Sequence, residues 1–234
     1  MSTHSHFHNT QVVILGGTSG LGRALALQLH QAQARVLVVA RHADGLAKLQ
    51  AEAPGILTLQ GDISDKQQVY ALAGSIQAQL PQIDTLFHVA STLGPTPLPL
   101  LLDTPCEDLE QVLTTNVMGP FRLTKALIPG MLLRQQGTVV TISSDAAVNA
   151  YPHWGAYSIS KAALDHMTRL FAAELHTQGL HFWAIDPGDM RTPMHFAAVP
   201  DADPTQLKDP AQAATQLLNL LPRLRTGDPV RHSL

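Results

Sequence analysis

The chain has 234 residues, 45% of them hydrophobic and 14% charged, with a formal net charge of −3 at pH 7. This amount of apolar material suits one large globular domain, and the slightly acidic balance argues against a basic surface for a nucleic-acid backbone or an anionic membrane. Cys106 is the one cysteine in the sequence, which rules out a disulfide within the chain and fits a reducing compartment.

Residues 1–10 form a polar leader in which no basic segment precedes an apolar one. Nowhere do eighteen apolar residues run uninterrupted, so we expect no membrane span and a cytoplasmic protein. His4, His6 and His8 alternate along the leader and could bind a metal. A frayed terminus is the preferred interpretation, and no metal site is expected.

From residue 11 onward, short apolar runs alternate with amphipathic segments of ten to twenty residues, which is the pattern of repeated β-α-β units. The runs interpreted as strands are 11–15, 35–40, 56–60, 84–90, 138–143 and 180–185. They predict an α/β fold of the Rossmann type, with six or seven strands in a doubly wound parallel sheet and helices on both faces. Residues 11–234 are expected to form one domain.

Local signals mark two features between these strands. Ser64 and Gln67 have the spacing of a capping box and predict the start of the helix after the third strand, which Pro81 would end. Residues 93–103, LGPTPLPLLLD, are rich in proline and predict a surface loop near the site rather than a domain boundary.

A glycine-rich turn follows the first predicted strand. Gly16, Gly20 and Gly22 stand in the sequence LGGTSGLG, where strand should give way to helix. A pyrophosphate needs backbone N–H groups and a helix N-terminus close to it, and residues without side chains allow that approach. The motif therefore predicts a dinucleotide site, although a glycine turn that only packs well has the same pattern.

The end of the second predicted strand bears on the choice of cofactor. An acidic residue there would accept the ribose 2′-hydroxyl, but the chain has Ala40 followed by Arg41, whose guanidinium suits a 2′-phosphate. NADP(H) is therefore expected over NAD(H), with a solvated arginine as the competing interpretation. Asp62, after the third strand, is placed to accept a hydrogen bond from an adenine amino group, or is simply a turn residue.

Tyr157 and Lys161 stand four residues apart and are neighbours on one helical face. Hydride exchange at a carbonyl carbon needs a proton donor beside the oxygen, and a tyrosine with a pKa of about 10 is nearly all neutral at pH 7. We expect the Lys161 ammonium to lower the pKa of Tyr157, an effect of about 4 kcal/mol in a partly desolvated pocket. Ser144, preferred over Ser143, could donate to the substrate oxygen, and Asn116 is an amide in a predicted helix that bends the backbone or holds a water.

These residues together resemble the short-chain dehydrogenase/reductases, in their classical single-domain form, over residues 11 to about 194. The resemblance implies that Tyr157 is the acid/base, Lys161 lowers its pKa and binds ribose, and Ser144 orients the substrate oxygen. It implies that Asn116 anchors a water in a proton relay. It also places Pro187 and Gly188 at the nicotinamide and Thr192 at its carboxamide. The expected cofactor contacts are Gly16, Thr18, Ser19, Gly20, Leu21, Gly22, Arg41, Asp62, Ile63, Ala90, Tyr157, Lys161, Pro187, Gly188 and Thr192.

After these motifs the resemblance implies a substrate-covering segment at about residues 189–205, with Met194, His195 and Phe196 offering apolar surface. Any of these three side chains could equally serve packing.

The chain departs from the family pattern at several places. Leu15 replaces the usual threonine before the first glycine, and His88-Val89-Ala90-Ser91 stands where the family has Asn-Asn-Ala-Gly. The replaced residues knit the sheet and let the nicotinamide ribose approach, so cofactor geometry could be altered. The ending GDPVRHSL lacks the usual Asp-Gly-Gly and supplies a short seventh strand or none.

The leading hypothesis is a cytoplasmic NADP(H)-dependent oxidoreductase that interconverts a small-molecule carbonyl compound and a secondary alcohol. The alternative is a catalytically weak or inactive dinucleotide-binding sensor or scaffold of the same fold, motivated by the altered segment at residues 88–91. A homodimer or homotetramer is expected, with no nucleic-acid or membrane partner.

Overall fold

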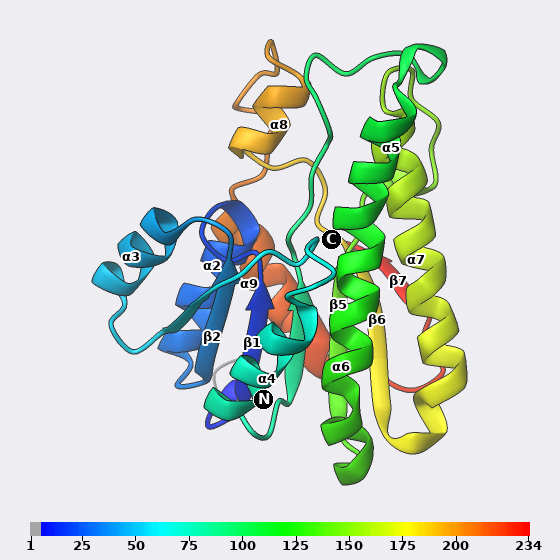
Figure 1. Cartoon of the computed structure of the whole chain (residues 1–234). Coiled ribbons are helices and arrows are strands. Elements are labelled where there is room, and N and C mark those ends of the chain that lie inside the picture. The colour runs from blue at the N-terminus through cyan, green and yellow to red at the C-terminus, as the bar shows by residue number, and fades with distance from the viewer. Residues whose placement is uncertain (1–5) are drawn as a thin grey trace.

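The computed structural model describes residues 6–234 and contains one seven-stranded parallel sheet (Figure 1). The strands are β1 (Gln11–Leu15), β2 (Arg35–Ala40), β3 (Leu57–Gln60), β4 (Thr85–His88), β5 (Gly137–Ile142), β6 (Leu180–Asp186) and β7 (Arg231–Ser233). Their order across the sheet is β3-β2-β1-β4-β5-β6-β7. The chain therefore winds outward in both directions from β1 and β4, which confirms the doubly wound Rossmann fold.

Helices cover both faces of this sheet (Figure 1). One core joins it to α2 (Gly20–Gln31), α3 (Ala43–Glu52) and α9 (Pro210–Leu220), and the other joins it to α4 (Val69–Gln79), α6 (Gly119–Arg134) and α7 (Gly155–Leu175). Two shorter helices, α5 (Cys106–Leu113) and α8 (Pro193–Ala198), lie beyond the carboxyl ends of the strands.

Alternation along β1 explains why its sequence is apolar throughout. Val12 and Ile14 pack into the core beneath α2 and α9, whereas Val13 and Leu15 pack into the core on the other face. Neither face reaches solvent, so a continuous apolar run replaces the alternating pattern of a half-exposed strand.

The predicted capping box at Ser64 is wrong. The helix that follows β3 begins at Val69, and the Ser64 hydroxyl donates to Asp62 Oδ1 at 2.7 Å instead of capping a helix. The backbone N–H of Gln67 donates to Asp65 Oδ1 at 2.8 Å. These aspartate-centred turns satisfy the backbone groups that a helix would have used, and they delay its start. The helix ends at Gln79, just before Pro81, as predicted.

The leader is more ordered than predicted. Phe7 is 2% exposed and packs into the core beneath α2 and α9, and the backbone N–H of Asn9 donates to Gln33 O at 3.1 Å. One buried aromatic ring holds this segment against the domain, so the prediction of a frayed leader fails from residue 6 onward. His4 lies outside the described residues.

Within residues 6–234 no cluster of three or more histidine, cysteine or acidic side chains is arranged to hold a metal ion. No helix in that range has the length and apolar character needed to cross a bilayer.

Candidate active site

The turn between β1 and α2 requires glycine at two positions, Gly16 and Gly22. Gly16 has a φ of +94°, and a Cβ added to it would lie 2.5 Å from the backbone nitrogen of Ala90. A Cβ on Gly22 would lie 1.9 Å from Gly16 O. Ser19, the N-cap of α2, makes no side-chain capping hydrogen bond, so the first-turn N–H groups are available to another acceptor. This arrangement fits a phosphate group.

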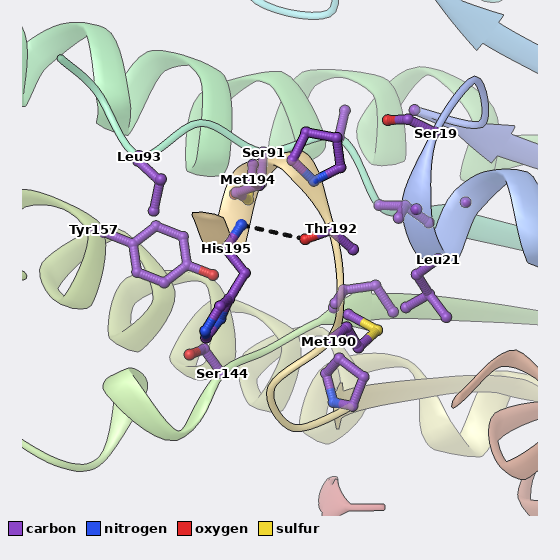
Figure 2. Close-up of a pocket in the computed structure, with 18 of the residues that line it drawn as sticks. Ser19, Leu21, Ser91, Leu93, Ser144, Tyr157, Met190, Thr192, Met194 and His195 are labelled. Atoms are coloured by element: carbon purple, nitrogen blue, oxygen red, sulfur yellow. Dashed lines mark hydrogen bonds between the residues drawn. The ribbon is translucent and has the colours of Figure 1, made fainter. Parts of the chain in front are cut away.

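A cavity of about 640 Å³ opens at the carboxyl ends of β1, β4, β5 and β6. That volume lies in the usual range for small-molecule sites. Every predicted cofactor contact lines this cavity, and the residues present therefore fit a dinucleotide: Gly16, Thr18, Ser19, Gly20, Leu21, Gly22, Arg41, Asp62, Ile63, Ala90, Tyr157, Lys161, Pro187, Gly188 and Thr192. Figure 2 shows several of them around the cavity.

Arg41 and His42 line one end of the cavity, at the end of β2. The sequence interpretation included Arg41 and overlooked His42, although its position directly after Arg41 was a usable signal. Asp62 lines the same region, and its Oδ1 accepts hydrogen bonds from the backbone and the hydroxyl of Ser64. The carboxylate thus both shapes a turn and borders the cavity, so neither interpretation of Asp62 excludes the other.

Tyr157, Lys161 and Ser144 meet at the other end of the cavity. The Lys161 ammonium donates to Ile142 O at 2.7 Å and lies 5.4 Å from the centroid of the Tyr157 ring. Ser144 caps a short 3₁₀ turn, η3 (Asp145–Ala147), and its hydroxyl donates to Asp145 Oδ1 at 3.1 Å. In Figure 2 the Tyr157 hydroxyl points toward Ser144.

The pKa of Tyr157 moves in the direction opposite to the prediction. Burial raises it well above its ordinary value, the Ser144 hydroxyl lowers it, and the negative charges of Asp186, Asp145 and Asp189 raise it further. A phenolate in this apolar wall loses its hydration, and the nearby carboxylates repel it. The structure of the chain alone therefore keeps Tyr157 protonated.

Burial acts on Lys161 as well. It is 3% exposed, and burial lowers its pKa to about 8, while the charges of Asp165 and Asp186 act in the opposite direction. Desolvation disfavours the charged ammonium, and its hydrogen bond to the Ile142 carbonyl oxygen partly replaces the lost water. The prediction placed the pair in a partly desolvated pocket, whereas Lys161 is almost completely buried.

Ser143 and Ser144 have different partners. The Ser143 hydroxyl donates to the buried Asp165 Oδ2 at 2.7 Å, while the Ser144 hydroxyl faces Tyr157. This difference agrees with the choice of Ser144 as the residue beside the reacting oxygen.

Asn116 is the predicted site residue that does not line the cavity. It lies in a π-helical turn, η2 (Thr114–Met118), and is 1% exposed. Its amide donates to Thr92 O at 2.8 Å and to Ser160 Oγ at 2.9 Å, and its oxygen accepts from the Thr92 backbone N–H at 2.8 Å. The helix is thus irregular at Asn116, and both hydrogens of its side-chain amide bind protein groups. Ser160 Oγ in turn donates to Tyr157 O at 2.7 Å, so Asn116 supports the helix turn that carries Tyr157.

The altered segment at residues 88–91 still joins the sheet. The backbone N–H groups of Val89 and Ala90 both donate to Leu15 O, at 2.9 and 2.7 Å. The His88 side chain is buried, with Nε2 2.8 Å from Thr124 Oγ1 and no partner for Nδ1. The Ser91 hydroxyl has no partner either and belongs to a residue that lines the cavity.

The expected covering segment folds as α8 and its flanks. Thr192 caps α8 by accepting a hydrogen bond from the His195 backbone N–H at 3.2 Å. Met194 and His195 line the cavity, and the His195 ring lies beside Ser144 and Tyr157 in Figure 2. Phe196 is absent from the cavity lining. Consecutive residues of a helix point in different directions, so Phe196 is directed away from the cavity that Met194 and His195 line. The sequence alone had grouped the three residues together.

Comparison with known proteins agrees with this geometry. Residues 10–203 match the sequence profile described as short chain dehydrogenase. The chain belongs to the short-chain dehydrogenase/reductase family. This family member is 32% identical to the bovine (Bos taurus) dehydrogenase/reductase SDR family member 7B, over 93% of this chain and 72% of the relative.

Two solved structures extend the comparison. A short chain dehydrogenase from Salmonella enterica serovar Typhi has a TM-score of 0.90 and 26% identity, and the alignment covers 100% of this chain and 98% of the other. A short chain dehydrogenase from Escherichia coli, solved in complex with NADPH, has a TM-score of 0.85 and 27% identity over 94% of this chain and 93% of the other. The structural similarity to these two dehydrogenases thus extends over all or nearly all of the chain.

Proposed function

We propose that the protein is an NADP(H)-dependent oxidoreductase that interconverts a carbonyl compound and a secondary alcohol. The observation that carries the proposal is one cavity with a glycine cradle at one end and Ser144, Tyr157 and Lys161 at the other. When bound there, the nicotinamide cofactor supplies or accepts the hydride.

Tyr157 is the proton donor in the reducing direction, giving the proton of its hydroxyl to the substrate oxygen as the carbon is reduced. The raised pKa of Tyr157 suits this direction, because a protonated phenol is the form that donates. Ser144, whose hydroxyl faces Tyr157, orients the same oxygen. The oxidising direction needs the phenolate, so we expect reduction to be the faster reaction at neutral pH.

Lys161 keeps a positive charge below the Tyr157 ring at neutral pH, because its pKa of about 8 leaves most of the ammonium protonated there. This charge stabilises the negative charge that develops on Tyr157 as the proton leaves. Asn116 holds the segment around Thr92 against the Tyr157 turn and acts through that support.

Preference for NADP(H) is supported by the two basic residues at the end of β2, Arg41 and His42, which border the cavity near the N-terminus of α3. A guanidinium binds a phosphate through paired hydrogen bonds. The NADPH complex of the Escherichia coli relative supports the same choice. We also propose a homodimer or homotetramer, because Ile159 and Leu170 leave apolar surface exposed along α7, and light scattering tests the assembly. A cytoplasmic location is proposed on separate grounds, because a single cysteine fits a reducing compartment.

The decisive experiment follows NADPH oxidation over a panel of ketones, aldehydes and quinones, with Tyr157→Phe as the variant. We expect turnover by the wild type and its loss in Tyr157→Phe, with NADPH affinity retained in both. Tight NADPH binding without turnover on a broad panel would instead support the sensor or scaffold. An unchanged rate in Tyr157→Phe would reject the assigned proton donor.

A further inference from the structure

The short strand β7 places an arginine beside the catalytic residues. Arg231 pairs with Ala184 of β6, and its side chain is only 18% exposed. Its Nε lies 3.1 Å from Asp165 Oδ2, and its Nη2 lies 2.9 Å from Asp186 Oδ2. The same Nη2 donates to Ser144 O at 3.1 Å. One guanidinium thus joins α7, β6 and the turn after β5.

Both acidic partners of Arg231 are hydrogen-bonded to residues that line the cavity. Asp165 Oδ2 also accepts from the Ser143 hydroxyl at 2.7 Å, next to Ser144 in the chain. Asp186 Oδ1 accepts from the Gly188 backbone N–H at 3.0 Å and so shapes the Pro187–Gly188 turn. Because a guanidinium presents its donors in a rigid plane, these contacts set the turns after β5 and β6 relative to each other.

Arg231 also balances buried charge. Asp165 and Asp186 are 2% and 5% exposed, and the charges of both act on Lys161. Buried carboxylates require a compensating cation or they take up protons. Arg231 is the arginine that contacts both of them, so it sets how much negative charge Lys161 experiences.

We propose that Arg231 is a positioning residue for the reaction: its guanidinium holds Ser144 and the Pro187–Gly188 turn in place and limits the negative charge beside Lys161. The inference rests on the proposed function. It gives the seventh strand, three residues long, a role in the active site beyond extending the sheet.

The competing explanation is that Arg231 only stabilises a short edge strand. The next residue on β7 separates the two explanations, because neighbouring side chains on a strand point to opposite faces. His232 packs on the opposite side, with its ring 5.8 Å from the Trp183 ring, and it lies outside the cavity lining. His232→Leu therefore disturbs β7 without touching the charge network.

The first measurement compares Arg231→Met, Arg231→Lys and His232→Leu with the wild type for melting temperature, NADPH dissociation constant, and kcat and KM with a reactive ketone. We expect Arg231→Met to lower kcat at least tenfold and to weaken NADPH binding severalfold, with partial recovery in Arg231→Lys. His232→Leu should lose comparable thermal stability and keep both values within twofold of wild type. A fourth variant, Arg231→Ala, tests chemical rescue: added ethylguanidinium should raise its kcat, since the cation can occupy the vacated space.

The second measurement is the pH profile of kcat. Lys161 faces Asp165 from its own helix, Asp186 from β6 and the Tyr157 ring, and Arg231 contacts both acids. Without Arg231 the uncompensated carboxylates favour the charged ammonium, so the alkaline limb should move to higher pH. If Arg231 had a purely structural role, its loss would lower kcat by the same factor at every pH and leave the alkaline limb where it is in the wild type.

The proposal is overturned if Arg231→Met and His232→Leu, at similar melting temperatures, change kcat, NADPH affinity and the alkaline limb alike. If Arg231→Met does not fold, Arg231→Gln replaces it, because glutamine removes the charge and keeps a hydrogen-bonding group, and a wild-type alkaline limb in that variant rejects the proposal. If the wild type reduces no substrate, the proposed function has failed. The positioning role of Arg231 is then tested by NADPH affinity alone. Equal NADPH dissociation constants for wild type and Arg231→Met would reject that role.

Discussion

Acid should destabilise this protein through a single buried histidine. His88 is 3% exposed at the end of β4, and burial lowers its pKa from 6.5 to about 3. The ring is held neutral because Nε2 contacts Thr124 Oγ1 and a proton on Nδ1 would find no acceptor. The variant His88→Asn keeps a hydrogen-bonding group near Thr124 and removes the titrating one.

The sign and size of the effect follow from the two pKa values. Between pH 6.5 and about 3 the unfolded chain binds a proton at His88 that the folded chain does not, so falling pH favours unfolding. The stability due to the neutral ring is complete above pH 6.5 and is lost at about 1.4 kcal/mol per pH unit below it. At about pH 5 the loss is about 2 kcal/mol, and over the full interval it approaches about 5 kcal/mol.

Urea unfolding, followed by tryptophan fluorescence at constant protein concentration, measures this difference. Wild type, His88→Asn and His166→Asn are compared at about pH 7 and about pH 5, with His166 chosen because it is exposed on α7. We expect wild type and His166→Asn to lose about 2 kcal/mol more than His88→Asn on acidification. Equal losses in all three proteins would show that His88 takes up its proton without unfolding, and would refute the reasoning.

Three further outcomes test other parts of the site. Arg41→Gln should weaken NADPH binding about tenfold, roughly 1.4 kcal/mol, and leave NADH binding nearly unchanged, as titration calorimetry would show; equal effects on both cofactors would contradict the 2′-phosphate assignment. Gly16→Ala should abolish NADPH binding and lower the melting temperature, because φ is +94° and the Cβ would meet Ala90, whereas wild-type affinity would contradict the cradle. The rate of ketone reduction should fall as pH rises through about 8, where Lys161 loses its proton. A rate that stays constant to about pH 10 would show that the mechanism does not need the positive charge of Lys161.

Local patterns in the sequence were sufficient for the sheet and for the cofactor contacts that line the cavity. The strands predicted at residues 11–15 and 35–40 match β1 and β2, because a strand buried on both faces must be apolar at every position. The glycine turn and the pair Tyr157 and Lys161 are likewise local, since a tight turn and one turn of helix each need only a few consecutive residues.

Distant contacts decided the rest. Arg231 and Asp165 are 66 residues apart, and nothing in the neighbourhood of either residue indicates the ion pair that joins β7 to α7. Ser64 has the spacing of a capping residue, yet Asp62 takes its hydroxyl. Phe7 looks like part of a polar leader until the core accommodates its ring.

The sequence by itself determined the order of strands and helices, the phosphate cradle and the identity of the proton-handling side chains, because these depend on periodicity and on short spacings along the chain. Only the tertiary structure decided the charge state of those side chains. The pKa values of Tyr157 and Lys161 depend on how completely the surrounding elements exclude water and on which carboxylates they bring near, and both are properties of packing between segments that are far apart in the sequence.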